Sequence, residues 1–98
     1  MSANTVEKRL QSDIRKEAKS LGFEVLVIRP QPGIPDGFED ILLLKEGFWG
    51  TIEVKDSPTA PYQPLQKERI AKHDDWSWAR RVDPTNWHEV REELRALA

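Results

Sequence analysis

One stretch of the sequence holds the side chains best suited to chemistry. Asp40 stands directly before the apolar run at residues 41–44, and Glu53 and Lys55 stand two positions apart near the end of the next apolar run. Successive side chains of a strand point to opposite faces, so Glu53 and Lys55 are expected to share one face. A turn at residues 45–47 would close a hairpin that brings Asp40 toward Glu53.

The expected proximity of Asp40 and Glu53 predicts a bound cation. Two carboxylates within about 5 Å repel, and each keeps its proton unless a positive charge intervenes. Mg²⁺ accepts a few carboxylate oxygens and keeps several waters, one of which can become a nucleophile, while a neighbouring lysine can hold that water or stabilise charge on a phosphate. With zero cysteines and only two histidines, sulfur-ligated zinc sites and thiolate nucleophiles are excluded. We therefore expect oxygen ligands and Mg²⁺ or Mn²⁺.

Hydrophobic spacing predicts the elements that must position these groups. Apolar residues recur in steps of four or three from Val6 to Leu21, which indicates an amphipathic helix, and Glu7 falls inside its apolar stripe. The order of the helices and strands expected along the chain predicts the α/β (α+β) class. A helix is followed by a small mixed central sheet of about four strands, flanked by helices. Helices are expected at residues 5–21, 64–72 (Leu65 and Ile70 facing inward) and 87–97, and strands at residues 23–29, 41–44, 48–54 and 76–82.

Composition describes one small domain, residues 1–98. Fifteen Lys+Arg against 17 Asp+Glu give a formal charge of −2, which excludes a histone-like mode of nucleic-acid binding through a broad positive surface. The length leaves no room for a second domain of ordinary size. No run of about 18 apolar residues and no signal-peptide pattern is present, so we expect a cytosolic protein without a membrane partner.

The sequence resembles the PD-(D/E)XK nuclease superfamily, in particular the small stand-alone VRR-NUC or phage Holliday-junction-resolvase type. The resemblance covers nearly the whole chain and rests on Glu7, the Gly33-Ile34-Pro35-Asp36 element followed by Asp40, the Glu53-Val54-Lys55 triplet and Gln66. It implies a restriction-endonuclease-like fold with an αβββαβ core plus a C-terminal helix. It also implies a metal-dependent endodeoxyribonuclease of a bacterial or phage-infected cytosol, acting on duplex or branched DNA such as Holliday junctions or flaps.

Residue roles follow from the same resemblance. Asp40 and Glu53 would bind Mg²⁺ or Mn²⁺, Lys55 would position the attacking water, and Glu7 would support the metal. Gln66 would contact the site or the DNA backbone. Glu7 and Gln66 also have ordinary interpretations, as an acid near the positive end of a helix dipole and as a polar group in a first helical turn.

The aspartate of the Gly-x-Pro-Asp element departs from the family pattern. Three residues, Gly37 to Glu39, separate Asp36 from Asp40, and only Asp40 adjoins the apolar strand. Either aspartate could be the ligand. We prefer Asp40, because it leaves the twelve residues before Glu53 that a tight hairpin explains, and Asp36 is then a loop residue or the alternative ligand.

The basic residues indicate where a nucleic acid could bind. Six basic residues are candidates for contacts with nucleic-acid phosphates: Arg29, Lys67, Arg69, Lys72, Arg80 and Arg81. The other interpretation is that they form an ordinary solvated face. His73 and His88 are expected in solvated positions. Symmetric cutting of two strands requires two active sites, so a homodimer is expected. No small-molecule cofactor besides the metal is expected.

Two other classes of function fit the same residues. One is a non-catalytic nucleic-acid-binding module of the same fold. The other is a small phage-type protein-interaction domain whose charged residues only decorate the surface.

Overall fold

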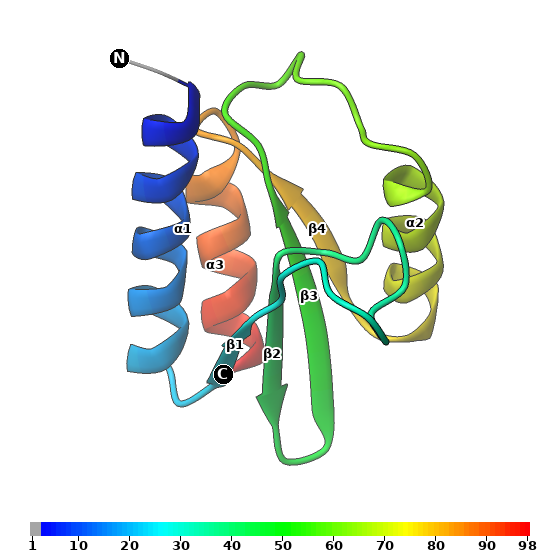
Figure 1. Ribbon diagram of the computed structural model, residues 1–98. Coiled ribbons are helices and arrows are strands. Elements are labelled where there is room, and N and C mark those ends of the chain that lie inside the picture. The colour runs from blue at the N-terminus through cyan, green and yellow to red at the C-terminus, as the bar shows by residue number, and fades with distance from the viewer. Residues whose placement is uncertain (1–2) are drawn as a thin grey trace.

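A single sheet with helices on both faces forms the molecule (Figure 1). The computed structural model describes residues 3–98. Within that range, three helices and a four-stranded mixed sheet confirm the predicted α+β class and order of elements. The elements are α1 (Ala3–Ser20), β1 (Glu24–Val27), β2 (Ile41–Lys45), β3 (Phe48–Val54), α2 (Gln66–Trp76), β4 (Ala79–Val82) and α3 (Trp87–Leu97).

The sheet has the strand order β1-β2-β3-β4. The first two pairs are antiparallel, and β3 and β4 are parallel. Parallel neighbours need a crossover connection, and α2 supplies it. In the β2–β3 hairpin Ile41 pairs with Ile52, so Asp40 and Glu53 occupy the next pair of positions.

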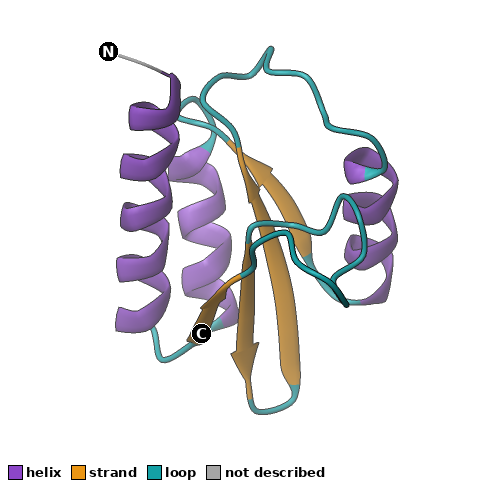
Figure 2. Cartoon of the chain, in the orientation of Figure 1, coloured by secondary structure: helices purple, strands orange, loops and turns teal. Residues whose placement is uncertain are grey.

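The two faces of the sheet differ in chemistry. Helices α1 and α3 lie side by side on one face and α2 lies on the other (Figure 2). The apolar stripe predicted on α1 is buried at Leu10, Ile14 and Ala18, because it packs with α3 on alternating residues of β2 and β3. The core is therefore apolar on the α1–α3 face. Within residues 3–98 no helix is long and apolar enough to cross a membrane.

Strand β1 is shorter than predicted, ending at Val27 rather than at residue 29. The following Ile28 nevertheless donates its backbone N–H to the Asp40 carbonyl oxygen at 2.7 Å. This bond holds the chain after β1 beside Asp40, directly before β2.

Helix α2 lies two to four residues later than predicted. Leu65 has a left-handed φ of 71°, so the helix begins only after it, and this side chain is 47% exposed rather than turned inward. Trp76, predicted in the last strand, ends α2 and is 64% exposed. The alternation of Trp76 with Trp78 and Val82 resembled a strand, but only the last two pack in the core.

Candidate active site

Asp40 and Glu53 lie beside each other where β2 begins and β3 ends. The backbone N–H of Val54 donates to Asp40 Oδ2 at 2.8 Å, which holds this carboxylate against β3. The hairpin register places Glu53 opposite Asp40. The structure thus brings together the two carboxylates that the sequence pattern paired.

Gln66, the first residue of α2, joins the charged groups of β3. Its Nε2 donates to Glu53 Oε2 at 2.9 Å, and its Oε1 accepts from Lys55 Nζ at 2.9 Å and from the Gln63 N–H at 2.7 Å. Lys55 Nζ lies 3.6 Å from Glu53 Oε2. Glu53, Lys55 and Gln66 are all buried. The amide of Gln66 therefore orients both the carboxylate and the ammonium.

Burial changes the protonation of the two carboxylates. Loss of solvation and then the nearby Asp40 carboxylate raise the pKa of Glu53 to about 8, although Lys55 opposes this. Burial also raises the pKa of Asp40, against the opposing hydrogen bond from Val54 N–H. At neutral pH the pair therefore retains a proton that a bound cation would displace.

One oxygen of the pair lacks a partner. Glu53 is only 3% exposed, and its Oε1 forms no hydrogen bond with any of residues 3–98. A buried acceptor left unsatisfied is costly. Asp40 lines both a cleft of about 520 Å³ and a smaller one of about 140 Å³. The two carboxylates can therefore be reached from solvent on the Asp40 side. A small cation entering there fits the two carboxylates.

The remaining predicted acids lie at the edges of this pair. Glu7 lines the smaller cleft with Asp40, and burial followed by the Asp56 and Asp40 carboxylates raises the pKa of Glu7. Asp36 is exposed and lines the broad cleft. Among residues 3–98, no three acidic or histidine side chains lie close enough to form a ready-made metal cage. Mg²⁺ commonly uses only one or two carboxylates and keeps several waters, and Asp40 with Glu53 would match that number.

Two carboxylates, an ammonium and an orienting amide thus meet at one end of the hairpin. This donor set suits a hard divalent ion and a negatively charged substrate. No family model, curated protein or solved structure matches this chain. The resemblance to PD-(D/E)XK nucleases therefore stays a prediction.

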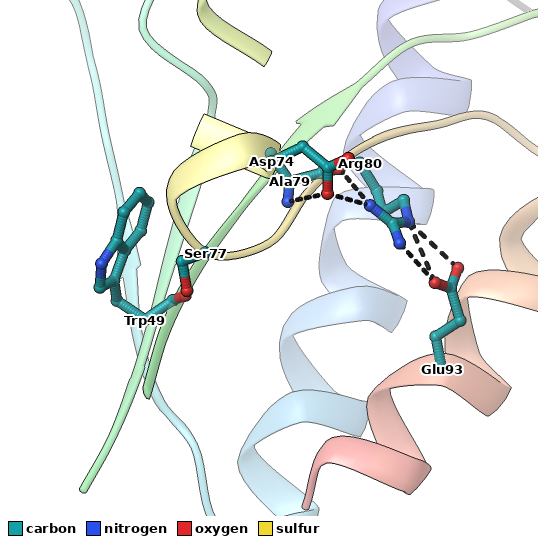
Figure 3. Close-up of polar contacts among 6 residues, drawn as sticks. All are labelled: Trp49, Asp74, Ser77, Ala79, Arg80 and Glu93. Carbon is teal, nitrogen blue, oxygen red and sulfur yellow. Dashed lines mark hydrogen bonds and ion pairs between the residues drawn. The ribbon is translucent and has the colours of Figure 1, made fainter. Parts of the chain in front are cut away.

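Two of the predicted DNA-binding arginines hold the protein together. Arg80 pairs with Asp74 at 2.6 Å and with Glu93 at 2.7 Å, which joins β4 to α2 and α3 (Figure 3). Arg81 lies 4.5 Å from the ring centre of Tyr62, and its Nη2 donates to the backbone carbonyls of residues 57, 58 and 60. Both arginines thus have partners inside the protein.

The other four basic residues lie on α2 and around the broad cleft. Arg29 is exposed and lines that cleft. Arg69 donates to the Asp36 carbonyl oxygen, and Lys72 lies over the Trp76 ring at 5.6 Å. Lys67 is exposed. Arg29 is therefore the predicted cation best placed to meet a phosphate beside Asp40.

The sequence interpretation of His73 is wrong. Rather than solvated, His73 is only 6% exposed, and its Nδ1 lies 2.5 Å from Oε2 of the fully buried Glu39. His88 is exposed, as predicted. Gln66 and His73 are seven positions apart and share a helix face, which was an available signal. Glu39 gave none, because it lies in a proline- and glycine-rich segment.

Gly37 lets the loop at residues 30–39 meet the start of α2 directly. Its φ is +77°, and a Cβ there would lie 2.8 Å from the Pro64 carbonyl oxygen and 2.9 Å from the Leu65 carbonyl carbon. We expect Gly37→Ala to lower the free energy of unfolding by about 2 kcal/mol more than Gly33→Ala. Gly33 is the matched control, because its φ is +94° but no described atom lies within 4 Å. Urea denaturation measures both, and equal losses would contradict a steric role for Gly37.

Proposed function

We propose that this chain is a divalent-metal-dependent endodeoxyribonuclease that hydrolyses DNA phosphodiester bonds. The observation that carries the proposal is the buried Glu53 carboxylate. One of its oxygens has no hydrogen-bond partner within residues 3–98, and the carboxylate lies beside Asp40 and is joined through Gln66 to Lys55. A half-buried aspartate and a buried lysine beside a buried glutamate contribute little net stability, which favours a functional reason for them.

Asp40 and Glu53 would hold Mg²⁺ or Mn²⁺. When bound, the ion supplies positive charge that stabilises a reacting phosphate and makes a water more acidic. Glu53 Oε1 is free to bind it, whereas Oε2 already accepts from Gln66. Glu7 lines the small cleft beside Asp40, where its carboxylate can accept hydrogen bonds from water around the ion.

Lys55 is placed to orient the attacking water or a phosphate oxygen. An ammonium has three N–H donors. Gln66 Oε1 takes one at 2.9 Å, and Glu53 Oε2 lies 3.6 Å away. If each of these two oxygens takes one N–H, the third can serve water or substrate. Because Gln66 also holds Glu53, the ammonium and the carboxylate keep a fixed relative orientation.

The broad cleft is the proposed path of the DNA backbone. It measures about 520 Å³, reaches Asp40 and Gln66 and has Arg29 on its wall. The order α1-β1-β2-β3-α2-β4 followed by α3 supports a restriction-endonuclease-like αβββαβ core. From the resemblance we propose the PD-(D/E)XK superfamily and branched DNA as the preferred substrate.

Paired cuts across a DNA branch require two sites related by a two-fold axis, so we propose a homodimer. We expect sedimentation equilibrium to give twice the mass of one 11.4 kDa chain. A monomer that still makes symmetric cuts would contradict this.

A cleavage panel tests the activity. Four-way junctions, flaps and nicked and linear duplexes are incubated with Mg²⁺, Mn²⁺, Ca²⁺ or EDTA. We expect product with Mg²⁺ and Mn²⁺ and none with EDTA, because the two carboxylates cannot supply positive charge themselves. Cleavage that persists in EDTA, or DNA binding without cleavage under every condition, would reject the proposal.

A further inference from the structure

Helix α2 is attached to the sheet by polar side chains. Within the described chain, the apolar core cluster draws on α1, α3, the sheet and the segments beside them, but on no residue of α2. The buried residues of α2 are Gln66 and His73, which lie seven positions apart on one face. Each contacts a carboxylate, since Gln66 bonds to Glu53 and His73 to Glu39. The buried face of this helix is therefore held to the sheet side of the molecule by two specific hydrogen-bonded anchors.

The second anchor is enclosed on several sides. Glu39 is 0% exposed, and its Oε1 finds no hydrogen-bond partner among residues 3–98, so His73 supplies its side-chain hydrogen bond. The imidazole lies 5.3 Å from the Phe38 ring, 5.6 Å from Trp49 and 5.7 Å from Trp76, between ring centres. Removing the one hydrogen-bond partner of a buried carboxylate strongly destabilises the folded protein.

The second anchor joins α2 to the residue next to Asp40, whereas the first joins α2 to the end of β3. Glu39 directly precedes Asp40 at the start of β2, and His73 lies two helical turns after Gln66 in α2. We propose that Glu39 and His73 are positioning residues, whose hydrogen bond sets α2 against the start of β2 so that Gln66 reaches Glu53 and Asp40 stays beside it. The consequence for metal binding rests on the proposed function, whereas the consequence for α2 does not.

Independent contacts hold the far end of α2. Asp74 accepts hydrogen bonds from the Ala79 N–H and from Arg80, and the Ser77 hydroxyl donates to the Trp49 carbonyl oxygen (Figure 3). The α1–α3 core lies on the opposite face of the sheet (Figure 1). Breaking the Glu39–His73 bond should therefore loosen α2 against the start of β2 without unfolding the protein.

The test compares His73→Phe, which fills the space without the hydrogen bond, with His73→Gln, which keeps a donor, and with His88→Phe at the exposed histidine. For His73→Phe we expect hydrogen exchange of α2 amides to rise about tenfold, with α1 and α3 within about twofold. Residues that position metal ligands without binding the metal also affect its affinity. We therefore expect the Kd for Mn²⁺, measured by calorimetry, to rise about tenfold in His73→Phe. His88→Phe should change neither, and His73→Gln should recover most of both.

Three outcomes would overturn the inference. Unchanged α2 exchange and Mn²⁺ affinity in His73→Phe would mean that the ring only fills space. An equal rise of exchange in all three helices would mean a global contribution to stability, and a His73→Gln no better than His73→Phe would exclude the hydrogen bond as the cause.

A double variant keeps the test decisive if His73→Phe does not fold. Glu39→Leu with His73→Leu removes both polar partners, which costs less than leaving one of them buried alone. We expect its α2 amides to be better protected than those of Glu39→Leu or His73→Leu alone, and additive losses would contradict a direct bond. If the wild-type protein cleaves no DNA, the proposed function fails, but α2 exchange still decides whether this pair positions the helix.

Discussion

Replacing Glu53 with glutamine is expected to lower the rate of Mg²⁺-dependent DNA cleavage by about 1,000-fold, equivalent to about 4 kcal/mol of transition-state stabilisation. The amide preserves the size of the side chain but removes the charge that would hold the ion beside Asp40. Single-turnover cleavage at saturating Mg²⁺ measures the loss. Because the buried carboxyl group has a pKa of about 8, glutamine imitates its form at neutral pH, and the fold should persist.

Two further variants test whether the loss of cleavage comes from this site. Lys55→Met should reduce cleavage to a similar extent with little effect on Mn²⁺ binding, because it removes the donor and not a ligand. Glu46→Gln alters an exposed carboxylate in the β2–β3 turn and should cleave like the wild type. Wild-type rates for Glu53→Gln or Lys55→Met, in protein with an unchanged unfolding transition, would reject the assigned site.

Stability without metal is expected to fall as the pH rises from about 4.5 to about 8. The pKa of Glu53 is raised from 4.5 to about 8 by burial and by Asp40, so in this interval the folded protein binds a proton that the unfolded chain has released. The contribution of this group is therefore full below the unfolded value and is lost as pH approaches the folded value. Urea denaturation in EDTA across this interval measures the slope, and Glu53→Gln should flatten it.

A divalent ion should counter this loss, because it replaces the proton. At pH 8, Mn²⁺ at tenfold excess over its Kd should raise Tm by about 5 °C or more, and at pH 5.5 by much less, since protons compete there. Calorimetric scans of the wild type, Glu53→Gln and Glu46→Gln separate binding at this site from general ion effects. A metal-induced rise that is equal at both pH values, or that survives in Glu53→Gln, would place the ion elsewhere.

The pairing of Asp40 with Glu53 was predictable because it depends on local geometry. Alternation along β3 puts Glu53 and Lys55 on one face, and a short turn leaves little freedom in the register of the hairpin. The amphipathic stripe of α1 was predictable for the same reason, since apolar spacing reports directly which face meets the core. Gln66 was predicted as a candidate, but its bridging position between Glu53 and Lys55 required the structure.

The start of α2 could not be predicted from propensity. Pro64 suits a first helical position, yet Leu65 adopts a left-handed conformation where the loop at Gly37 packs on its backbone. Gln66 and His73 are the buried residues of the helix that begins after Leu65. Distant segments, not the local sequence, decided this register.

The sequence by itself determined the class of fold, the order of elements and the meeting of an acid pair with a lysine at one hairpin. Those features follow from periodicity and short turns, which involve neighbours along the chain. Only the tertiary structure decided which face of α2 is buried, that Glu39 and His73 bond, and that Arg80 and Arg81 are occupied by internal partners. These contacts join residues far apart in sequence, and a buried polar group is stable only where the fold happens to supply its partner.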